Sequence, residues 1–314
     1  MNPGGLFGAL LPVFFVLALG YMAGKRHSFD TTQAGGLNKL ALGYALPSSL
    51  FVSMTDIQRP LLLQQGKVVL ALLLAHVGLF LIAWLILERI KQFKGTAAVI
   101  CALFLSTSAT PVFGIAVLQP LLGPTSAGTV GLVALAINLT VPLAIILLEI
   151  SSGGAQQDSA SRHKAIINGL KAGLKSPLLW APIAGIAFVL LNVPLPKPAA
   201  GAMEMIGSAT SGVALFAVGL TLNAYSFHFS RFVLIGSLAR ISVQTAVFFL
   251  LAHLLSAQGV FVREALVCCS FPMATIVVLF ATKYKSLEGE AASILLLSTL
   301  SLLITVPLTL AIGG

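Results

Sequence analysis

Residues 105–111 read Leu-Ser-Thr-Ser-Ala-Thr-Pro, and residues 270–275 read Ser-Phe-Pro-Met-Ala-Thr. Each stretch places hydroxyl side chains and a proline in the middle of a long apolar segment. Proline removes a backbone donor and clashes with the preceding helical turn, so each helix is predicted to kink or split there. Freed backbone groups are tolerated in a membrane only where protein or a water-filled cavity surrounds them. The two stretches therefore predict two broken membrane helices that face the protein interior.

A constant shift of 165 residues relates these two stretches and other punctuating residues. Thr-Val-Pro-Leu at 140–143 recurs at 305–308, and Gly20 and Phe51 align with Gly185 and Phe216. Matches of proline, glycine and threonine at one shift indicate that a single unit is duplicated.

The composition excludes a water-soluble globular protein, because 58% of the residues are hydrophobic, only 9% are charged and the mean hydropathy is +1.02. A spanning helix needs roughly 20 mostly apolar residues. We therefore predict an all-α integral membrane protein with ten transmembrane helices, at residues 6–24, 36–54, 68–87, 96–118, 127–149, 177–191, 200–222, 232–255, 265–282 and 291–312.

Each half of the chain holds five predicted spans, an odd number, so the second half must enter the membrane from the opposite side. The expected organisation is two inverted five-helix repeats, residues 1–150 and 176–314, joined by a cytoplasmic linker at 151–175. Inverted repeats are typical of secondary transporters, in which the substrate site lies near the bilayer midplane between the repeats. The fourth and ninth spans, which carry the breaks, are therefore the first candidates for a substrate site.

The basic residues predict the orientation in the membrane. Of the 18 Lys and Arg residues, 13 lie in loops on one side, Arg240 lies inside a span, and four lie in loops on the other side: Arg59, Lys67, Lys197 and Arg263. Basic loops mark the cytoplasmic side. We expect a multi-pass protein of the cytoplasmic (inner) membrane with both termini outside. Because the charge is spread over short loops, the expected surroundings are the lipid bilayer and no nucleic acid.

The breaks combine hydroxyl groups with new helix termini. Thr107, Ser108, Thr110 and Thr275 supply hydroxyls, and the N-terminus of each half-helix offers free N–H groups and a partial positive charge, which suits a carboxylate. The alternative is that the hydroxyls only satisfy backbone groups freed by the prolines. Breaks at matching places in both repeats favour a substrate site.

Two further spans are candidates for a wall of this site. The second span carries Tyr44, Ser48 and Ser49, and residues 207–212 of the second repeat are also small and polar at the same depth. Small residues also allow close helix packing, which is the alternative. Asn138 is an amide inside the fifth span, equally able to bridge helices or to bind substrate.

Arg240 is predicted inside the eighth span, where an unpaired cation is costly. A carrier of anions would contain such a cation, because the substrate carboxylate can supply the missing charge. Alternatively, the side chain reaches the cytoplasmic surface or binds helix carbonyls. The residues leave both roles open.

Ion coupling and enzymatic chemistry are constrained by what the sequence lacks. None of the nine acidic residues is predicted at the middle of a span, and Glu264 is expected just before the span at 265–282. A coupling ion, H⁺ or Na⁺, would therefore bind at the breaks, travel with the substrate or use a histidine. For His76 and His253, packing near a helix end is favoured over proton relay. Nucleotide-binding, zinc-protease and Ser-His-Asp motifs are absent, so we expect no enzyme, no cofactor and no metal.

The chain resembles the auxin efflux carrier family over essentially its whole length. The resemblance rests on Pro12 with Gly-Tyr-Met-Ala-Gly-Lys at 20–25, Ala-Leu-Pro-Ser-Ser-Leu-Phe at 45–51, Ala-Leu-Phe-Ala-Val-Gly-Leu-Thr-Leu at 214–222 and Pro-Met-Ala-Thr at 272–275. Within the family, the chain is similar to the bacterial malonate carriers in particular.

This resemblance implies the fold of sodium/proton antiporters and bile-acid carriers, in which the fourth and ninth helices are unwound and cross. It also implies a homodimer and an elevator mechanism, with spans 1, 2, 6 and 7 as scaffold and spans 3–5 and 8–10 as a moving transport domain. The family's crossover positions correspond here to Thr107, Ser108, Thr110, Pro111, Pro272, Met273, Ala274 and Thr275.

The sequence thus predicts a secondary active transporter of a small organic anion, with malonate uptake favoured. Efflux of an auxin-like or other monocarboxylate is the alternative within transport. A membrane receptor or sensor is the alternative outside transport, and the five-plus-five repeat argues against it.

Overall fold

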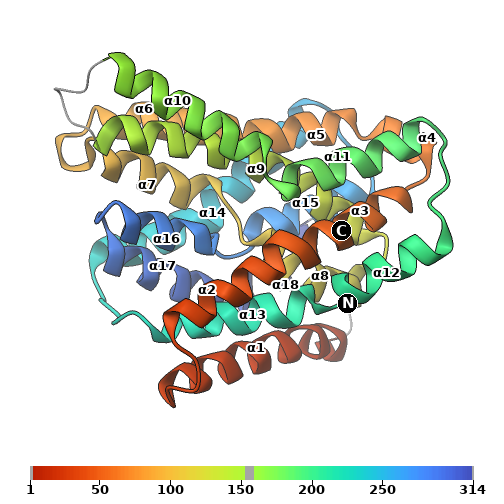
Figure 1. Ribbon diagram of the computed structural model, residues 1–314, viewed down its shortest axis with the longest axis horizontal. Helices are drawn as coiled ribbons and strands as arrows, with labels where there is room; N and C mark the ends of the chain where they lie inside the picture. The colour runs from red at the N-terminus through yellow and green to blue at the C-terminus, as the bar shows by residue number, and fades with distance from the viewer. Residues whose placement is uncertain (1–2, 153–158, 313–314) are drawn as a thin grey trace.

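The computed structural model describes residues 3–152 and 159–312 (Figure 1). In this part of the chain all regular elements are helical, and the only extended pairing is one isolated antiparallel bridge between Ser108 and Met273. The helices are α1 (Pro3–Lys25), α2 (Thr31–Leu40), η1 (Ala41–Ala45), α3 (Leu46–Thr55), α4 (Arg59–Gln64), α5 (Gly66–Leu73), η2 (Leu74–Gly78), α6 (Leu79–Glu88), η3 (Lys91–Phe93), α7 (Thr96–Ser106), α8 (Thr110–Leu122), α9 (Ser126–Ser152), α10 (Ser159–Leu174), α11 (Pro177–Leu190), α12 (Lys197–Gly207), α13 (Ala209–Asn223), α14 (Arg231–Leu254), α15 (Val260–Ser270), α16 (Thr275–Lys283), α17 (Glu288–Leu300) and α18 (Leu302–Ile312).

The all-helical membrane class is confirmed. Five stretches of the described chain are long and apolar enough to cross a membrane, and the bent pair α17 and α18 makes a sixth if it is counted as one span. The other four predicted spans are not among them: residues 96–118 and 265–282 are each divided between two helices, residues 177–191 form the short α11, and residues 36–54 lie in the continuous stretch α2, η1 and α3. The count of ten spans therefore stays a prediction.

Two of the helical stretches contain a π-helical turn. Ala41–Ala45 (η1) joins α2 to α3, and Leu74–Gly78 (η2) joins α5 to α6. A π-turn shifts the hydrogen-bond register by one residue and is often found at functional sites. In η2 the shift coincides with a carbonyl, that of Ala75, which accepts a hydrogen bond from another helix.

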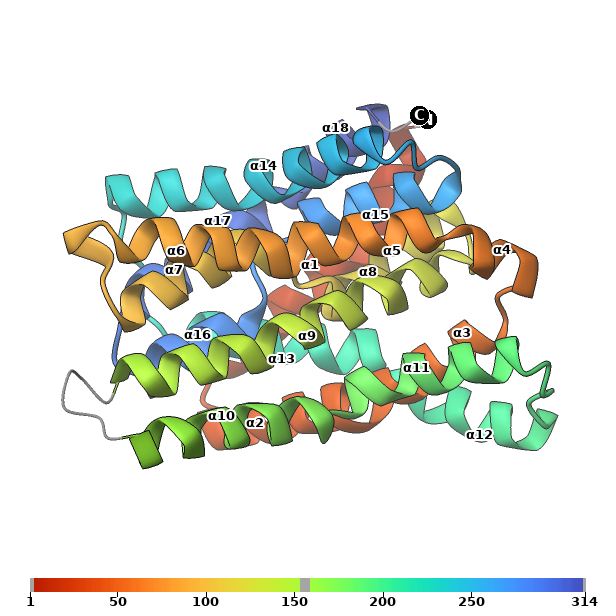
Figure 2. The ribbon, with the colours of Figure 1, turned by 90° about the horizontal axis from the view of Figure 1, so that it is seen from above.

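The predicted linker is largely helical. Residues 153–158 lie outside the described part, and α10 occupies most of the remainder. Gly169 and Gly173 of α10 lie against Ile146 and Pro142 of α9, so α10 packs along the helix that precedes it. Seen from above, α10, α2, α11 and α12 lie along one side of the molecule and α14 along the opposite side, with the broken helices between them (Figure 2).

Glycine contacts hold α1 against α13 and α11 against α3. A β-carbon at Gly20 would collide with the backbone carbonyl of Phe216, and one at Gly185 would lie 2.8 Å from the carbonyl oxygen of Phe51. The 165-residue shift converts one contact into the other, because it maps Gly20 onto Gly185 and Phe51 onto Phe216. Glycine is required at both positions because the two helix backbones lie so close that a β-carbon on one would overlap backbone atoms of the other.

We expect Gly20→Ala to lower the free energy of unfolding by about 1–3 kcal/mol, because the methyl group must displace backbone rather than a flexible side chain. The measurement is the midpoint of thermal unfolding of the purified protein in detergent. Gly8→Ala is the matched control in the same helix, since nothing lies within 4 Å of a β-carbon at Gly8. A midpoint unchanged in both variants would contradict the close approach.

Candidate functional site

The two predicted breaks lie side by side and are hydrogen-bonded to each other. The amide of Ala109 donates to the carbonyl of Pro272 at 2.7 Å, and the amide of Ala274 donates to the carbonyl of Thr107 at 3.3 Å. The 165-residue shift maps 107 onto 272 and 109 onto 274, so it exchanges these two bonds. The short extended segments therefore satisfy each other's backbone groups where no helix can do so.

The two prolines have different positions relative to the helix ends. Pro111 lies in the first turn of α8, where a missing N–H costs nothing and the fixed φ angle suits helix initiation. Pro272 lies in the extended segment between α15 and α16 and contributes only its carbonyl. At each break the helix is therefore fully interrupted rather than kinked. The two interruptions create the N-termini of α8 and α16 at the centre of the protein.

The hydroxyl groups at the first break are fully buried and all have partners. Thr110 Oγ1 donates to the Cys268 carbonyl at 3.0 Å and lies 2.7 Å from Ser108 Oγ, while Thr107 Oγ1 donates to the Leu103 carbonyl. Thr275 is 8% exposed at the start of α16. The bond from Thr110 to Cys268 connects the start of α8 to α15.

Helix α14 supplies hydrogen-bond donors to the C-terminal ends of α7 and α15, the half-helices that precede the two breaks. Arg240 Nη2 donates to the carbonyls of Phe271 at 2.9 Å and Cys269 at 3.3 Å, and Gln244 Nε2 donates to the carbonyl of Ser106 at 2.7 Å. Ser106 and Phe271 are related by the 165-residue shift. The C-terminus of a helix carries partial negative charge, so a cation and an amide donor stabilise the two exposed ends.

Arg240 is completely buried and therefore does not reach the membrane surface. Of the roles predicted for Arg240, the structure shows the one in which it binds helix carbonyls. Its Nε and Nη1 have no partner among the described residues. Gln244, one turn further along α14, also donates to the carbonyl of Ala75 at 3.3 Å. The shift places Ala75 at the position of Arg240, so the first repeat has no corresponding cation.

His76 differs from the sequence expectation of a packing role near a helix end, and His253 agrees with it in position only. His76 is fully buried in the π-turn at the middle of its span, and its Nδ1 lies 2.9 Å from the Leu72 carbonyl. The apolar stretch continues on both sides of it, so the assumption of a helix-end position was wrong. His253 is exposed in the last turn of α14.

The largest cavity described has a volume of about 870 Å³, and its lining on α8 begins at Ile115, five residues after Thr110 of the crossing. It is bounded by α3, α8, α12, α13, the turn that precedes α9 and the first turn of α15, and its polar residues include Ser49, Ser53, Ser208, Ser211 and Gln119. Asp56 and Glu204 also line it. Of the residues predicted for the site, Ser49 lies on this wall.

The remaining predicted residues lie away from the crossing. Tyr44 is 59% exposed on the outside of η1, and Ser48 donates to its carbonyl within the same helix. Asn138 donates to the Ala134 carbonyl of its own helix and accepts a bond from Ser176 at 3.3 Å. Asn138 therefore bridges α9 to the start of α11, which is one of the two roles considered for it.

Glu264 is an acidic residue that the sequence interpretation placed outside the membrane span. It is only 1% exposed, within α15, and Thr129 Oγ1 of α9 donates to its Oε2. The adjacent Arg263 made the position resemble a loop. The signal that could have identified it is the apolar run 260–262, which starts the helix before the charged pair.

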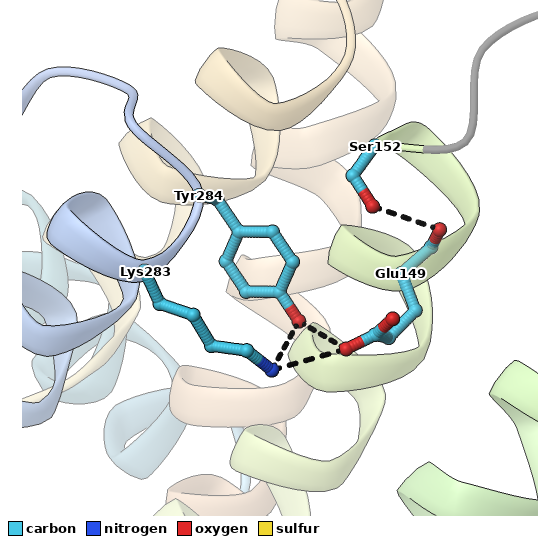
Figure 3. Close-up of polar contacts among 4 residues, drawn as sticks. All are labelled: Glu149, Ser152, Lys283 and Tyr284. Carbon is cyan, nitrogen blue, oxygen red and sulfur yellow. Dashed lines mark hydrogen bonds and ion pairs between the residues drawn. The ribbon is translucent and has the colours of Figure 1, made fainter.

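At the opposite end of α9, a polar cluster ties this helix to the end of α16 (Figure 3). Glu149 Oε1 accepts bonds from Tyr284 Oη at 2.6 Å and Lys283 Nζ at 3.1 Å. Burial and the bond to Glu149 raise the pKa of Tyr284, so the phenol remains a donor. Ser152 Oγ donates to the Glu149 carbonyl in the last turn of α9.

Comparison with known proteins identifies the family. The family described as "Membrane transport protein" matches residues 6–310. The chain is 29% identical to the uncharacterized transporter YfdV of Escherichia coli over 96% of this chain and 95% of that protein. It is 28% identical to a putative malonate transporter of Rhizobium meliloti over 95% of this chain and 93% of that protein.

A further relative is the lysosomal cholesterol signaling protein of mouse, 26% identical over 69% of this chain but only 26% of that longer protein. The two bacterial transporters match nearly end to end, and the family match covers almost the whole chain. Together with the apolar helices, these matches show that the chain is a multi-pass membrane protein that belongs to the auxin efflux carrier family of membrane transporters.

Proposed function

We propose that this transporter is a secondary active carrier that brings small carboxylates, malonate in the first place, into the cell across the cytoplasmic membrane. The observation that carries the proposal is the paired break, which brings the N-termini of α8 and α16 together. Two such termini present free N–H groups and partial positive charge to an anion with two carboxylates. The similarity to a putative malonate transporter supports this choice of substrate.

We propose that the chain is organised as ten spans in two inverted repeats. Support comes from contacts that the 165-residue shift exchanges: those of Gly20 and Gly185, and the two backbone bonds of the crossing. The first turn of α1 and the last turn of α18 lie at the same end of the molecule as α4 and α12, which agrees with both termini outside (Figure 2).

The proposed mechanism is alternating access between a scaffold and a transport domain. The packing of α1 with α13 and of α3 with α11 and α12 supports a scaffold made of spans 1, 2, 6 and 7. The large cavity is lined by α3, α12 and α13 of the proposed scaffold and by α8 and α15 of the proposed transport domain, and its Asp56 and Gln58 lie in a loop predicted to face outward. Sliding of the transport domain along this boundary would expose the crossing to each side in turn. We also propose that two copies of the chain form a homodimer with their scaffolds together.

Within this mechanism, Arg240 and Gln244 position the crossing and do not contact substrate. Both side chains approach the half-helix ends from α14, which packs against α7, α15, α17 and η2. Arg240 does not line the large cavity between the proposed domains. Its charge offsets the negative ends of the half-helices, so the positive N-termini of α8 and α16 are left for an anion.

The function is tested with purified protein in proteoliposomes. We expect exchange of labelled malonate that unlabelled malonate abolishes and that succinate, acetate and indole acetate inhibit less. The expected order follows if each of the two half-helix N-termini binds one carboxylate of a small dianion. Equal inhibition by indole acetate, or no exchange above protein-free vesicles, would contradict malonate as the substrate.

For the hydroxyls of the crossing, we expect Thr110→Val to raise the KM for malonate by about 10-fold or more, because a hydrogen bond to a charged group contributes about 1.5–3 kcal/mol. Thr140→Val is the matched control: Thr140 is equally buried but donates to the Ala136 carbonyl of its own helix. Its KM should stay unchanged. Equal KM values in the two variants would limit Thr110 to a structural role.

For Arg240, substitution by methionine separates positioning from substrate binding. The positioning role predicts that the midpoint of thermal unfolding falls, because two carbonyls at the end of α15 lose their donor. Gln244→Met removes one strong bond from the end of α7 and should cause a smaller fall. A raised KM with an unchanged unfolding midpoint in the Arg240 variant would instead indicate contact with the substrate.

A further inference from the structure

Glu264 is a carboxylic acid buried inside a membrane helix with a single described partner. Thr129 Oγ1 donates to its Oε2, and its other oxygen, Oε1, has no partner among the described residues. An ionisable residue enclosed at membrane depth is costly and is commonly part of an ion or proton path. Enclosure also disfavours the ionised carboxylate relative to the neutral acid. In this enclosed position, the neutral, protonated form of the Glu264 carboxyl is therefore favoured over the ionised form.

The position of this pair connects it to the large cavity. Phe261 of α15 and Thr125, just before α9, both line the cavity. Glu264 follows Phe261 by three residues and Thr129 follows Thr125 by four, which is one helical turn in each case. The acid and its hydroxyl partner thus lie one turn below the cavity wall on two adjacent helices, α15 and α9.

The next turn of α15 connects the acid to the crossing. Cys268 follows Glu264 by four residues, and its carbonyl accepts the bond from Thr110 Oγ1 at 3.0 Å. Thr110 in turn contacts Ser108 in the extended segment. Glu264 therefore lies on α15, the half-helix whose Cys268 carbonyl binds Thr110, so a change of its charge is made one turn from the crossing.

The charged and titratable groups on the surrounding helices leave Glu264 without a fixed counter-charge. The described parts of α8 and α18 carry no titratable group, α9 carries only Glu149 at its far end, and α5 carries only the exposed Lys67. On α14, Arg231 and His253 lie at the ends, and Arg240 binds carbonyls at the end of α15.

Within α15 itself, the adjacent Arg263 extends toward the Leu310 carbonyl of α18, and Cys268 and Cys269 are free thiols. No ion pair to Glu264 occurs in the part of the chain that the structure describes. The carboxylate therefore has to take a neutralising cation from solution, and a proton is the one that needs no further ligand groups in this enclosed position.

We propose that Glu264 is the proton-carrying residue of transport, so that each substrate anion enters the cell together with a proton. A hydronium ion in the cavity releases the proton and becomes water, the proton reaches Oε1 across the one helical turn between them, and Thr129 keeps its bond to Oε2. After the transport domain has moved, Glu264 returns the proton to water on the cytoplasmic side. This inference rests on the proposed carrier function, which supplies the movement between the two sides.

The first test detects the protonated carboxyl directly and does not depend on any substrate. Infrared difference spectra of the purified protein between mildly acidic and alkaline buffer should show the C=O stretch of a protonated carboxyl. The band should be lost in Glu264→Gln and kept in Glu288→Gln, a control at the start of α17 where the carboxylate is partly exposed. Persistence of the full band in Glu264→Gln would overturn the proposal.

The second test measures coupling in proteoliposomes with an internal pH dye. Wild-type protein and Glu288→Gln should accumulate labelled malonate under an inward proton gradient, with a matching internal acidification. In Glu264→Gln, whose amide has the shape of the protonated acid, both signals should fall to the level of protein-free vesicles while malonate exchange remains measurable. Retained accumulation in Glu264→Gln, or wild-type accumulation driven by a sodium gradient instead, would overturn the proposal.

The two tests separate this inference from the carrier function on which it rests. If wild-type protein exchanges no malonate but the infrared band behaves as expected, the proton site is supported and malonate is the wrong substrate. If malonate is exchanged but the band does not depend on Glu264, the carrier function holds and the proton site is wrong.

Discussion

The structure depends on two backbone hydrogen bonds, between Ala109 and Pro272 and between Ala274 and Thr107. Interrupting a helix inside a membrane leaves donors and acceptors that water cannot satisfy. A single interrupted helix would leave these groups without partners. Two interrupted helices that cross antiparallel satisfy them, because the amide of each extended segment donates to a carbonyl of the other. The crossing can therefore form only when the helices on both sides of each break are folded, and it brings four helix ends together in the protein.

Those four ends are stabilised in different ways. The N-termini of α8 and α16 begin with threonines, and Pro111 removes one donor from the first turn of α8. The C-termini of α7 and α15 receive donors from a single helix, α14, through Gln244 and Arg240. The two breaks are thus alike in backbone arrangement and unlike in side-chain support.

Much of the architecture could be predicted because proline, glycine and hydroxyl residues recur at one shift in an apolar chain. The breaks at Thr107 and Pro272 follow from local backbone chemistry, and so does the helical class. Side-chain roles depend on which faces meet, and a single sequence does not contain that information. Tyr44 therefore proved to be exposed, and Glu264 was assigned to a loop although it is enclosed by α9 and α15. The substrate-binding role of the crossing residues stays a prediction.

Arg240 also has an electrical consequence. It is a buried cation, and the described part of the chain shows no ion pair to it. Any displacement of α14 along the membrane normal carries this charge through the transmembrane field, which acts with ~2.3 kcal/mol per elementary charge for each ~100 mV. The residue that secures the end of α15 thereby makes such a displacement voltage-sensitive, and in a cell with a negative interior the field pulls that charge inward.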